Sequence, residues 1–528
     1  MRGISEENEA TVRTTLEQLK PEGGEQDGQN HDRKVEMKVK HKFWGTQPVT
    51  QLGEEPPLTE GCIEPSKPAS EVRQEPYPLR KEFEWSTVDV CDDAQLRELY
   101  EFLSANYVED DDASFRFRYS AEFLRWALKP PGYYKEWHVG VRVVATKKLV
   151  AFVSGVPLTV RVRENVLSAS EVNFLCVHKK LRSKRLAPVL IKEVTRRCHL
   201  KGVFQALHTG GVFIPTPVST CSLNVPKLVS VGFTSVPTNM TLARMMRQHL
   251  LPSRPHLLSQ GLREMEERDV PEVADLYARY MKRFGMAIIM TEDEVRHHFL
   301  SGRGEGPNSI DSWKTPRAGQ CVWTYVMEDP HTHKVTDFFS FFSLPSSIID
   351  SPKHDVLKVA YLFYYATEVV FKPGAETDGS LKERLMQLVS DALIIADQSG
   401  FDVFNALTLM DNAEFIPDLK DGAIIRNDGY RGRSCWEGNW CRVGLIYYEY
   451  ITVSALAGNG LEVCLDSREG GRRLQENWVS KELSKWRETK AGPWSGQDPL
   501  QPPGTCDRLS RAARAGRCNA KKNEPDPS

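Results

Sequence analysis

The sequence predicts an α/β (α+β) fold made of two similar halves between polar tails. Alternating strand and helix patterns run from residue 84 to about 211, and a weak copy of their beginning recurs near residue 262. The chain has 528 residues, of which 40% are hydrophobic, and this is enough to bury a sizeable core. Its net charge of -2 implies no general attraction to nucleic acid or to a membrane surface.

Both ends of the chain predict disorder. Residues 1–40 are polar, with few aromatics and no apolar stretch typical of a secretory signal. Residues 447–528 are expected to form a divergent, disordered tail, in which the periodicity is lost from about residue 466. No run of about 18 apolar residues predicts a membrane span. The 11 cysteines lie scattered without a CxxC pair, which is typical of reduced thiols in a cytoplasmic protein and predicts no zinc site.

The first half contains a series of short apolar segments. Residues 139–144 and 149–154 predict two strands joined by a turn, and residues 172–177 predict a central strand. Residues 187–200 predict a helix with Pro188 in its first turn. This half is therefore expected to place a helix directly after a buried strand.

The second half begins like the first. Residues 92–100 and 269–277 each place Asp at a helix start and a Leu-Tyr pair at the same offset. Each is followed by a second helix start, at Ser120 and at Thr291. Short matches of this kind also arise by chance, so the similarity has two interpretations, an internal duplication and a coincidence. Later elements of the second half are expected at 338–344 (a strand) and 381–396 (a helix).

A basic loop separates the central strand from its helix. Five cations fall within seven positions, and the helix opens just behind them: Lys179, Lys180, Arg182, Lys184 and Arg185. Amide groups at a helix N-terminus attract anions, and the helix dipole assists. A ligand with several phosphates, such as coenzyme A, suits this loop. The alternative is a solvated basic turn or a nuclear-localisation-like cluster. Nucleic acid is disfavoured, because no basic stripe with interleaved aromatics is found elsewhere.

The strand and loop also resemble a known signature. Glu171–Lys179 (EVNFLCVHK) and its continuation to Pro188 are similar to the glycylpeptide N-tetradecanoyltransferase (N-myristoyltransferase) family. The resemblance covers roughly residues 38–420 and includes His41–Pro48, Tyr107–Asp112, Phe115–Phe117, Trp126–Leu128, Asp337–Phe341, Tyr361–Thr367 and Phe401–Leu407. It implies two acetyltransferase-like (GNAT-like) halves, related by pseudo-twofold symmetry around a mixed sheet. It also implies transfer of a tetradecanoyl (myristoyl) group from myristoyl-CoA to the N-terminal glycine amine of proteins.

The resemblance implies that the two halves bind different substrates. The half at 41–250 would bind the acyl-CoA, and the half at 251–446 would bind the peptide. Myristoyl-CoA would be a co-substrate, with no prosthetic group and no metal. Proteins or peptides with an N-terminal glycine would be the partners of a monomer that neither binds nucleic acid nor inserts stably into membranes.

The resemblance also implies roles for single residues. The backbone N–H groups of Phe174 and Leu175 would form the oxyanion hole, with Thr209 near the attacking amine. The acyl-CoA would contact His41, Lys42, Phe43, Trp44, Leu175, Cys176, Val177, Ser183, Lys184, Arg185, Leu186 and Ala187. The peptide would contact Tyr107, Val108, Asp110, Phe115, Phe117 and Tyr119. For the aromatics, ordinary core packing is the alternative. Cys176 lies mid-strand and is expected to be inert packing, not a nucleophile.

Four segments depart from the family pattern. In one of them, Lys420–Arg426 (KDGAIIR) stands where the family has Lys-Phe-Gly-x-Gly-Asp-Gly. His208-Thr-Gly-Gly211 stands where the family has Tyr-Thr-Ala-Gly, and Thr220-Cys221 continues directly to Asn224 without the family's Arg-Tyr-x-His-Arg stretch. In the family a terminal carboxylate after a short apolar strand is the base. Residues 443–446 resemble that strand, but about 80 residues follow, so the base would be displaced. Glu449 is a hypothetical substitute. The alternatives are an acyl-CoA-binding protein of the same fold with impaired catalysis, and a general N-acetyltransferase.

Overall fold

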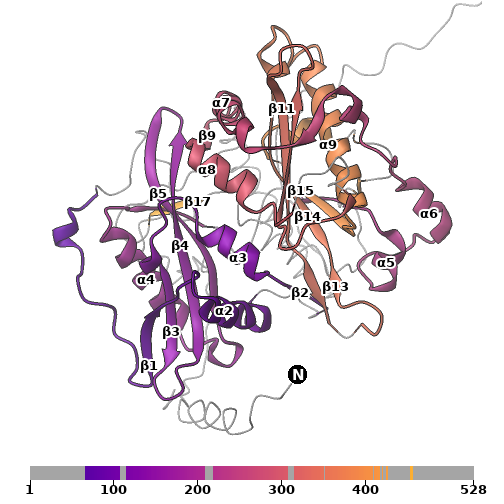
Figure 1. The fold of residues 1–528 in the computed structure, drawn as a ribbon. Helices are drawn as coiled ribbons and strands as arrows, with labels where there is room; N and C mark the ends of the chain where they lie inside the picture. Colours follow the sequence, from indigo (N-terminus) through magenta and orange to yellow (C-terminus); the bar gives the residue numbers. More distant parts are fainter. Residues whose placement is uncertain are drawn as a thin grey trace, which may run out of the picture. The chain divides into compact units, whose positions relative to one another are not determined.

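The computed structural model describes a large part of the chain (Figure 1). The described residues are 66–107, 114–208, 218–306, 314–349, 351–407, 409–416, 419, 424–425 and 452–455. The chain divides into two compact units, Met1–Glu469 and Gly470–Ser528, and every described residue belongs to the first. No helix in this described part is long and apolar enough to cross a lipid bilayer.

The first sheet holds the predicted central strand. Its order is β1 (Phe83–Thr87), β3 (His138–Val143), β4 (Leu149–Val162), β5 (Asn165–Val177), β6 (Gln205–His208) and β17 (Thr452–Ala455), with β9 (Met286–Ile289) paired to β4. β5 and β6 are parallel, and the other neighbours are antiparallel. The predicted strands at 139–144, 149–154 and 172–177 are confirmed. β4 and β5 extend beyond them as one long hairpin.

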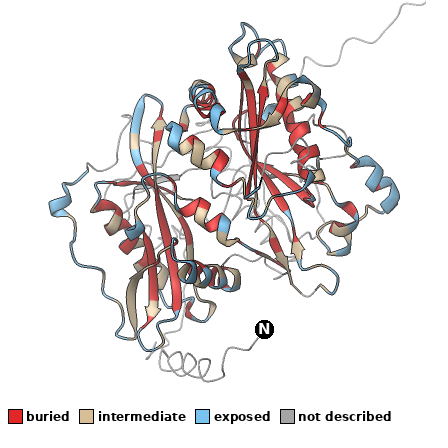
Figure 2. Ribbon diagram, in the orientation of Figure 1, coloured by how far each residue is buried: buried red, intermediate tan, exposed pale blue. Residues whose placement is uncertain are grey.

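The second sheet repeats this arrangement. Its order is β8 (Leu262–Glu264), β10 (Val322–Glu328), β11 (Val335–Ser343), β14 (Val359–Thr367), β15 (Val403–Leu407), β7 (Val218–Ser222) and β16 (Ile424–Ile425). Only β14 and β15 are parallel. All nine residues of β14 are buried, as expected for a central strand with helices on the sheet (Figure 2). A coincidence does not explain two sheets with the same order and the same parallel pair, so the predicted two-half α/β fold is confirmed.

The helices follow the same repeat. α2 (Asp93–Asn106), α3 (Ala121–Leu128) and α4 (Leu186–His199) of the first half correspond in order to α7 (Val270–Met281), α8 (Glu292–Arg296) and α9 (Ser380–Gln398). The helices predicted at 187–200 and 381–396 are α4 and α9. The remaining elements are β2 (Phe115–Phe117), β12 (Ser346–Ile348), β13 (Val356–Leu357), α5 (Val225–Ser230), α6 (Leu242–Gln248), α10 (Asn412–Phe415) and short helical turns at 69–71, 135–137, 179–181, 256–260, 267–269, 297–301 and 368–371.

The two halves exchange strands. β7 lies before residue 230 in the chain but pairs with β15 of the second sheet, whereas β17 and β9 come from later residues and pair with β6 and β4. β2 likewise pairs with β12. β17 falls inside the 447–528 segment that was expected to be a disordered tail, so at least these four residues have a ladder partner. A sequential boundary near residue 250 therefore does not separate the two sheets in space.

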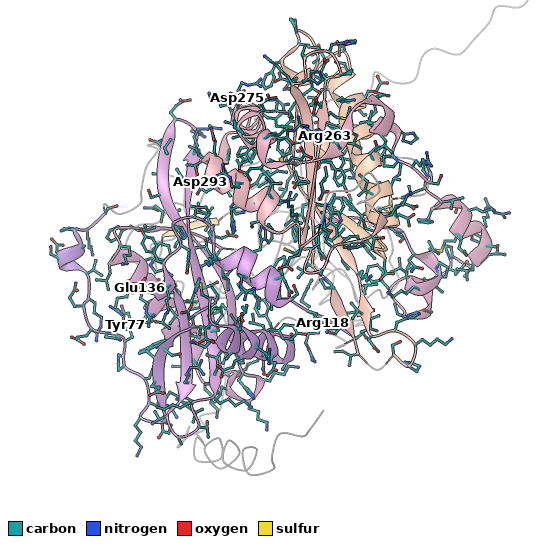
Figure 3. The ribbon with its side chains drawn as sticks, viewed as in Figure 1. Tyr77, Arg118, Glu136, Arg263, Asp275 and Asp293 are labelled. Carbon is teal, nitrogen blue, oxygen red and sulfur yellow. The ribbon has the colours of Figure 1, made fainter. Side chains whose placement is uncertain are left out.

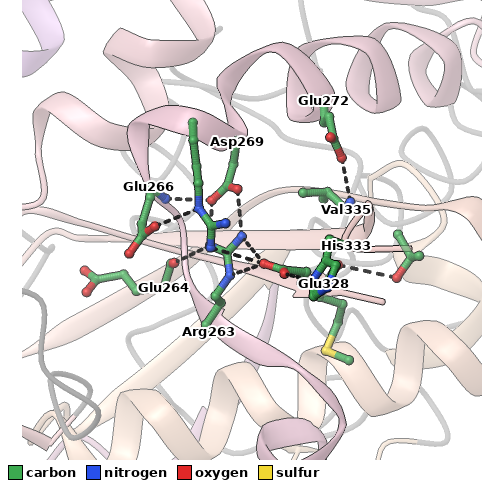
Figure 4. Close-up of polar contacts among 11 residues, drawn as sticks. Arg263, Glu264, Glu266, Asp269, Glu272, Glu328, His333 and Val335 are labelled. Carbon is green, nitrogen blue, oxygen red and sulfur yellow. Dashed lines mark hydrogen bonds and ion pairs between the residues drawn. The ribbon is translucent and has the colours of Figure 1, made fainter. Parts of the chain in front are cut away.

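Helix starts show where the sequence reading was right and where it was not. Asp92 accepts the N–H groups of Ala94 and Gln95, and Ser120 accepts that of Phe123, as predicted. Asp269 also precedes its helix, but its carboxylate does not cap α7. It accepts the Glu266 N–H and pairs with both terminal nitrogens of Arg263 at 2.7 Å, which joins α7 to β8 (Figure 4).

Candidate active site

The predicted oxyanion residues lie in a bulge of β5. Phe174 and Leu175 lie opposite a single residue of β4, Val153, and the pairing register shifts there. Within the described residues, the pairing of β5 with β6 ends at Glu171 and does not reach the bulge. Phe174 has a φ of 55°, in the left-handed region, which costs a non-glycine residue on the order of 1–3 kcal/mol. The bulge thus takes two backbone amides out of the regular ladder in the middle of the sheet.

The second half has a bulge at the equivalent place, and there a side chain satisfies an amide. Phe363 and Tyr364 of β14 lie opposite Ser340 of β11. The Tyr364 N–H donates to Ser340 Oγ over 3.1 Å, and Ser340 Oγ donates to the Tyr364 carbonyl over 2.9 Å. Val153 occupies the position of Ser340 in the first half and has no hydroxyl. The Leu175 amide therefore has no side-chain acceptor at this position of β4.

Three of the predicted peptide residues converge on Phe174. The rings of Tyr119 and Tyr107 lie 5.1 and 6.0 Å from that of Phe174, and Phe117 stacks on Tyr119 at 6.1 Å. Phe115 instead packs edge-on against Phe233. All of these except Tyr107 and Phe233 are buried, so the described cluster is packed core, with Tyr107 at its margin.

Two tyrosine hydroxyls meet the bulge. Burial raises the pKa of Tyr107 far above its ordinary value, the neighbouring Cys176 adds to this, and a hydrogen bond from the Phe174 amide offsets it in part. The Tyr107 hydroxyl therefore occupies the place at the Phe174 N–H where another acceptor can bind. The buried Tyr119 hydroxyl has no hydrogen-bond partner within the described residues. The cluster around Phe174 thus contains two tyrosine hydroxyls inside an otherwise apolar core.

The thiol next to the bulge is unreactive. Cys176 is 2% exposed, and burial raises the pKa of its thiol to about 12, although Arg182 and Lys179 act in the opposite direction. A thiol with this pKa carries almost no thiolate near neutral pH. Its environment agrees with the expectation of inert packing.

A carboxyl that the sequence reading passed over lies three residues before the bulge. Glu171 is partly buried, and burial raises the pKa of its carboxyl to about 8, while a hydrogen bond with Asn173 acts to lower it. A carboxyl with this pKa can accept or release a proton near neutral pH. The signal available in the sequence was a charged residue directly before the apolar segment 172–177. Only the structure shows that the pairing of β5 with β6 ends at this residue.

The basic loop has the backbone shape of an anion site. Ser183 and Arg185 have φ values of 66° and 60°. Arg185 is the N-cap of α4 and makes no side-chain cap, so the amides of Arg185, Leu186 and Ala187 have no acceptor within the helix. Pro188 follows without an N–H group. Lys184 and Arg185 are exposed, which keeps two cations beside these amides.

The corresponding loop of the second half carries its own anion. Asp378 accepts the N–H of Ser380 over 2.8 Å at the start of α9, and this bond lowers the pKa of the Asp378 carboxyl. Glu376 in the same loop pairs with Arg283 at 2.8 Å. The equivalent helix N-terminus is thus already supplied with acidic groups. An anionic ligand is therefore favoured at α4 and disfavoured at α9.

Buried polar contacts hold the loop and α4 in place. The Asn106 side-chain carbonyl accepts the Lys179 N–H over 3.1 Å, and its backbone carbonyl accepts Arg182 over 2.5 Å, so the end of α2 fixes the loop. Glu193 of α4 is fully buried and pairs with Arg196 at 2.6 Å and with Arg197 at 2.9 Å. Glu193 also accepts the Tyr77 N–H, and Arg197 donates to the Glu136 carbonyl; Tyr77 and Glu136 lie beside α4 (Figure 3). Arg182 and Asn106 position the loop, a role that the sequence pattern did not reveal.

Some predicted site residues lie outside the described residues. They are His41, Lys42, Phe43, Trp44, Val108, Asp110, Thr209 and Glu449, together with the strand expected at 443–446. Thr209 directly follows β6, and Val108 directly follows Tyr107, so both continue from elements that border the bulge. Within the described residues, no group of three His, Cys, Asp or Glu side chains is placed to hold a metal ion.

Two family models match the chain. The model described as "Myristoyl-CoA:protein N-myristoyltransferase, N-terminal domain" matches residues 62–221, and the corresponding C-terminal domain model matches residues 230–427. Together they cover both sheets except β17. The loop and the bulge lie in the first match, and β11, β14 and α9 lie in the second.

Known proteins show the same similarity. Glycylpeptide N-tetradecanoyltransferase of Schizosaccharomyces pombe is 50% identical over 396 residues, which cover 74% of this chain and 81% of that protein. That of Mycosarcoma maydis is 47% identical over 455 residues, and the match spans only 63% of its length. The crystal structure of Saccharomyces cerevisiae N-myristoyltransferase with bound myristoyl-CoA is similar with a TM-score of 0.67 at 43% identity, covering 73% of this chain and 90% of that one.

The raised pKa of Glu171 predicts a pH-dependent stability. Between its ordinary value of 4.5 and about 8, the folded state holds a proton that the unfolded state has released. Stability should therefore fall as pH rises through this window, by at most about 1.4 kcal/mol for each pH unit. Urea unfolding of wild type and Glu171→Gln across this range measures how the free energy of unfolding depends on pH. This free energy should change less with pH in the variant.

The control for this measurement is Glu136→Gln, which removes a carboxylate whose side chain is 59% exposed. Its stability profile should run parallel to that of the wild type. A Glu171→Gln profile parallel to the wild type would contradict the burial of this carboxyl.

Proposed function

Because the chain belongs to the N-myristoyltransferase family, we propose that it transfers a tetradecanoyl (myristoyl) group from myristoyl-CoA to the N-terminal glycine amine of proteins. The observation that carries the proposal is the course of the chain through the bulge, the basic loop and the start of α4. Two amides of a buried bulge and three amides of an uncapped helix start lie on one continuous stretch, Phe174–Ala187. An acyl-CoA has its thioester and its phosphates at two separated places, and this stretch offers a donor set for each.

The proposed reaction needs no protein nucleophile. The glycine amine attacks the thioester carbonyl, a C–N bond forms and the C–S bond breaks. The proton that the amine nitrogen loses goes to the departing thiolate, so coenzyme A leaves as its thiol. The N–H groups of Phe174 and Leu175 stabilise the oxyanion that develops on the carbonyl oxygen. For this to happen the Tyr107 hydroxyl must give up the Phe174 amide, so acyl-CoA binding and the position of Tyr107 are coupled. Cys176 takes no part, because its thiol stays protonated.

The remaining residues are proposed to contact either the acyl-CoA or the peptide. Ser183 to Ala187 hold the phosphates, with Leu175, Cys176 and Val177 along the acyl-CoA. On the peptide side, Tyr107, Phe117 and Tyr119 border the bulge and Phe115 lies further away. His41, Lys42, Phe43 and Trp44 are proposed to cover the acyl-CoA. Val108, Asp110 and Thr209 are proposed for the peptide and its amine.

The assignment of halves and partners is part of the same proposal. Acyl-CoA binding belongs to residues 41–250 and peptide binding to residues 251–446, in a monomer whose partners are proteins with an N-terminal glycine. The strand exchange supports a shared site, because β7 and β17 tie each sheet to residues of the other half. A cytoplasmic location is proposed with it.

A second candidate is an acyl-CoA-binding protein of the same fold that transfers poorly. β7 ends at Ser222 and Asn224 already caps α5, so only Leu223 lies between the strand and the helix cap. The peptide side is altered there, whereas the bulge and the basic loop are intact. This observation favours retained acyl-CoA binding with impaired transfer, and activity is what separates the two candidates.

The separating experiment uses the full chain. Incubation with myristoyl-CoA and a peptide that begins with glycine should release free thiol and give an acylated peptide, and acetyl-CoA should give far less product. Binding of myristoyl-CoA without product would support the second candidate. A chain ending at Ile446 tests the proposal that residues 447–528 slow the reaction, with a chain ending at Ala455, which keeps β17, as the control. The shorter chain should transfer faster than the full chain, and loss of transfer by both shortened chains would contradict the proposal.

Neutralising the loop should weaken acyl-CoA binding. Lys184→Ala combined with Arg185→Ala removes two cations beside the free amides of α4, and each such cation near a phosphate contributes about 1 kcal/mol, so affinity should fall about tenfold or more. Titration calorimetry at low and high salt should show a smaller salt dependence for the variant.

A matched variant removes the same charge elsewhere. Lys334→Ala combined with Lys372→Ala neutralises two exposed lysines of the second half. This variant should bind myristoyl-CoA like the wild type. Equal affinity for all three proteins would mean that the loop does not hold phosphate.

The contrast between Val153 and Ser340 predicts that a hydroxyl at residue 153 would occupy the Leu175 amide of the proposed oxyanion site. In Val153→Thr, a hydroxyl equivalent to that of Ser340 can accept the Leu175 N–H. Loss of one oxyanion donor costs about 100-fold in kcat, so this variant should lose tenfold or more in kcat with little change in KM. Single-turnover and steady-state assays measure both.

Val160→Thr is the control, since it makes the same change at another fully buried position of β4. Both variants bury an added hydroxyl, so both lose stability, but only Val153→Thr should lose kcat. An equal loss in the two variants would remove the proposed role of the Leu175 amide.

A further inference from the structure

The segment around α6 combines exposed apolar and basic side chains. Leu242, Met246 and Leu250 are 37%, 43% and 80% exposed and follow each other at intervals of four residues. Only seven large apolar side chains are this exposed within the described residues, and three of them fall in these nine positions. Single exposed apolar residues are ordinary, whereas a cluster marks an interaction site. We define the α6 patch as Leu242, Arg244, Met246, Arg247, Leu250 and Arg254.

The helix is held so that this stripe stays outside. The Thr241 hydroxyl accepts the Arg244 N–H at its start, and the ring of His249 bonds the Met245 carbonyl at its end. Met245 and His249 are buried, which anchors one face of the helix, and α6 packs on α5. The remaining face is exposed along the whole helix (Figures 1 and 2).

The charge of this region has one sign. The sequence contains no Asp or Glu between Glu193 and Glu264. Arg244, Arg247 and Arg254 are exposed, and no ion pair involves them in the described part of the chain. The acidic groups nearest in contact with this region are buried and engaged: Asp402 with Lys227 at 2.6 Å, and Asp391 with the amides of His256 and Leu257. The α6 patch therefore presents only positive charge.

We propose that the α6 patch docks the protein on the anionic surface of a lipid bilayer. A short amphipathic helix with apolar residues on one side and arginines beside them lies in the headgroup region and inserts its apolar side chains. Arginines near an anionic surface add attraction that falls off within the screening length. A protein partner is a poorer match, since standard protein interfaces use about 20–30 residues on each side. The proposal rests on α6 and is independent of the proposed transfer reaction.

Vesicle binding tests the proposal with the full chain. Sedimentation with phosphatidylcholine vesicles should recover little protein, and addition of phosphatidylserine should recover much more, with a decrease at high salt. Arg244→Gln combined with Arg247→Gln should weaken binding to the anionic vesicles about 25-fold, since each cation contributes about fivefold. Met246→Ser combined with Leu250→Ser should weaken it about tenfold.

The controls separate docking from loss of folding. Val144→Ser combined with Val166→Ser removes two exposed apolar side chains outside the patch and should bind like the wild type. Leu250→Trp should bind more tightly, because Trp favours the bilayer interface, and its unchanged acyl-CoA affinity would show that the variant is folded. All variants should keep the acyl-CoA affinity of the wild type, because the patch contributes no residue to the candidate active site.

Three results would overturn the proposal. They are no wild-type binding to anionic vesicles, equal binding by wild type and both patch variants, and self-association in sedimentation velocity that the patch variants abolish. The last result would assign the patch to a second copy of the chain.

Discussion

One extra residue in β5 is the constraint on which the rest of the candidate site depends. Opposite Val153 the strand carries two residues, and the left-handed Phe174 is held there by the rings of Tyr119 and Tyr107. Side chains of a strand alternate between its faces, so without the extra residue every residue after it would change face. Cys176 would then leave the core, and the chain would enter the basic loop from the wrong side. The backbone strain at Phe174 is offset by aromatic packing, which makes the bulge and the core one structure.

The two sheets differ in the side chains around their bulges and helix starts, and this difference is why we propose the oxyanion and phosphate contacts in the first half. Both sheets have the same strand order, the same parallel pair and a bulge at the same place. They differ in a few side chains, and these decide whether the N–H groups of the bulge and of the helix start donate to an acceptor within the protein. Ser340 accepts the bulge amide of the second half, and Asp378 accepts the first amide of α9. Val153 and the basic loop before α4 supply no such acceptor, so the donors that the second half uses for its own stability are proposed to serve a ligand in the first half, where at the bulge it must displace the Tyr107 hydroxyl.

Because the two halves exchange strands, each half depends on the other for its folded structure. β7 completes the second sheet, and β9 and β17 extend the first. Trp126 of α3 donates to the His297 carbonyl and packs against Phe342 and Phe363, so the first half also contributes to the core of the second. Loss of order in either half therefore removes strands from the other. This is why a boundary drawn from the sequence near residue 250 describes the order of the chain but not its folding units.

The sequence by itself determined the strands at 139–144, 149–154, 172–177 and 338–344, the helices at 187–200 and 381–396, the helix caps at Asp92, Ser120 and Thr291 and the basic loop, because these depend on local periodicity, local hydrogen bonds and residue charge. It underestimated β5, since Ser168, Ser170 and Glu171 interrupt the apolar pattern that marks a buried strand, and it misread Asp269, whose partners Arg263 and Glu266 lie outside the helix. Only the tertiary structure decided the bulge, the raised pKa of Glu171, the anchoring of the loop by Asn106 and the exchange of β7 and β17. Each of these is a contact between residues far apart in the chain, and no local pattern encodes which distant partner a residue will meet.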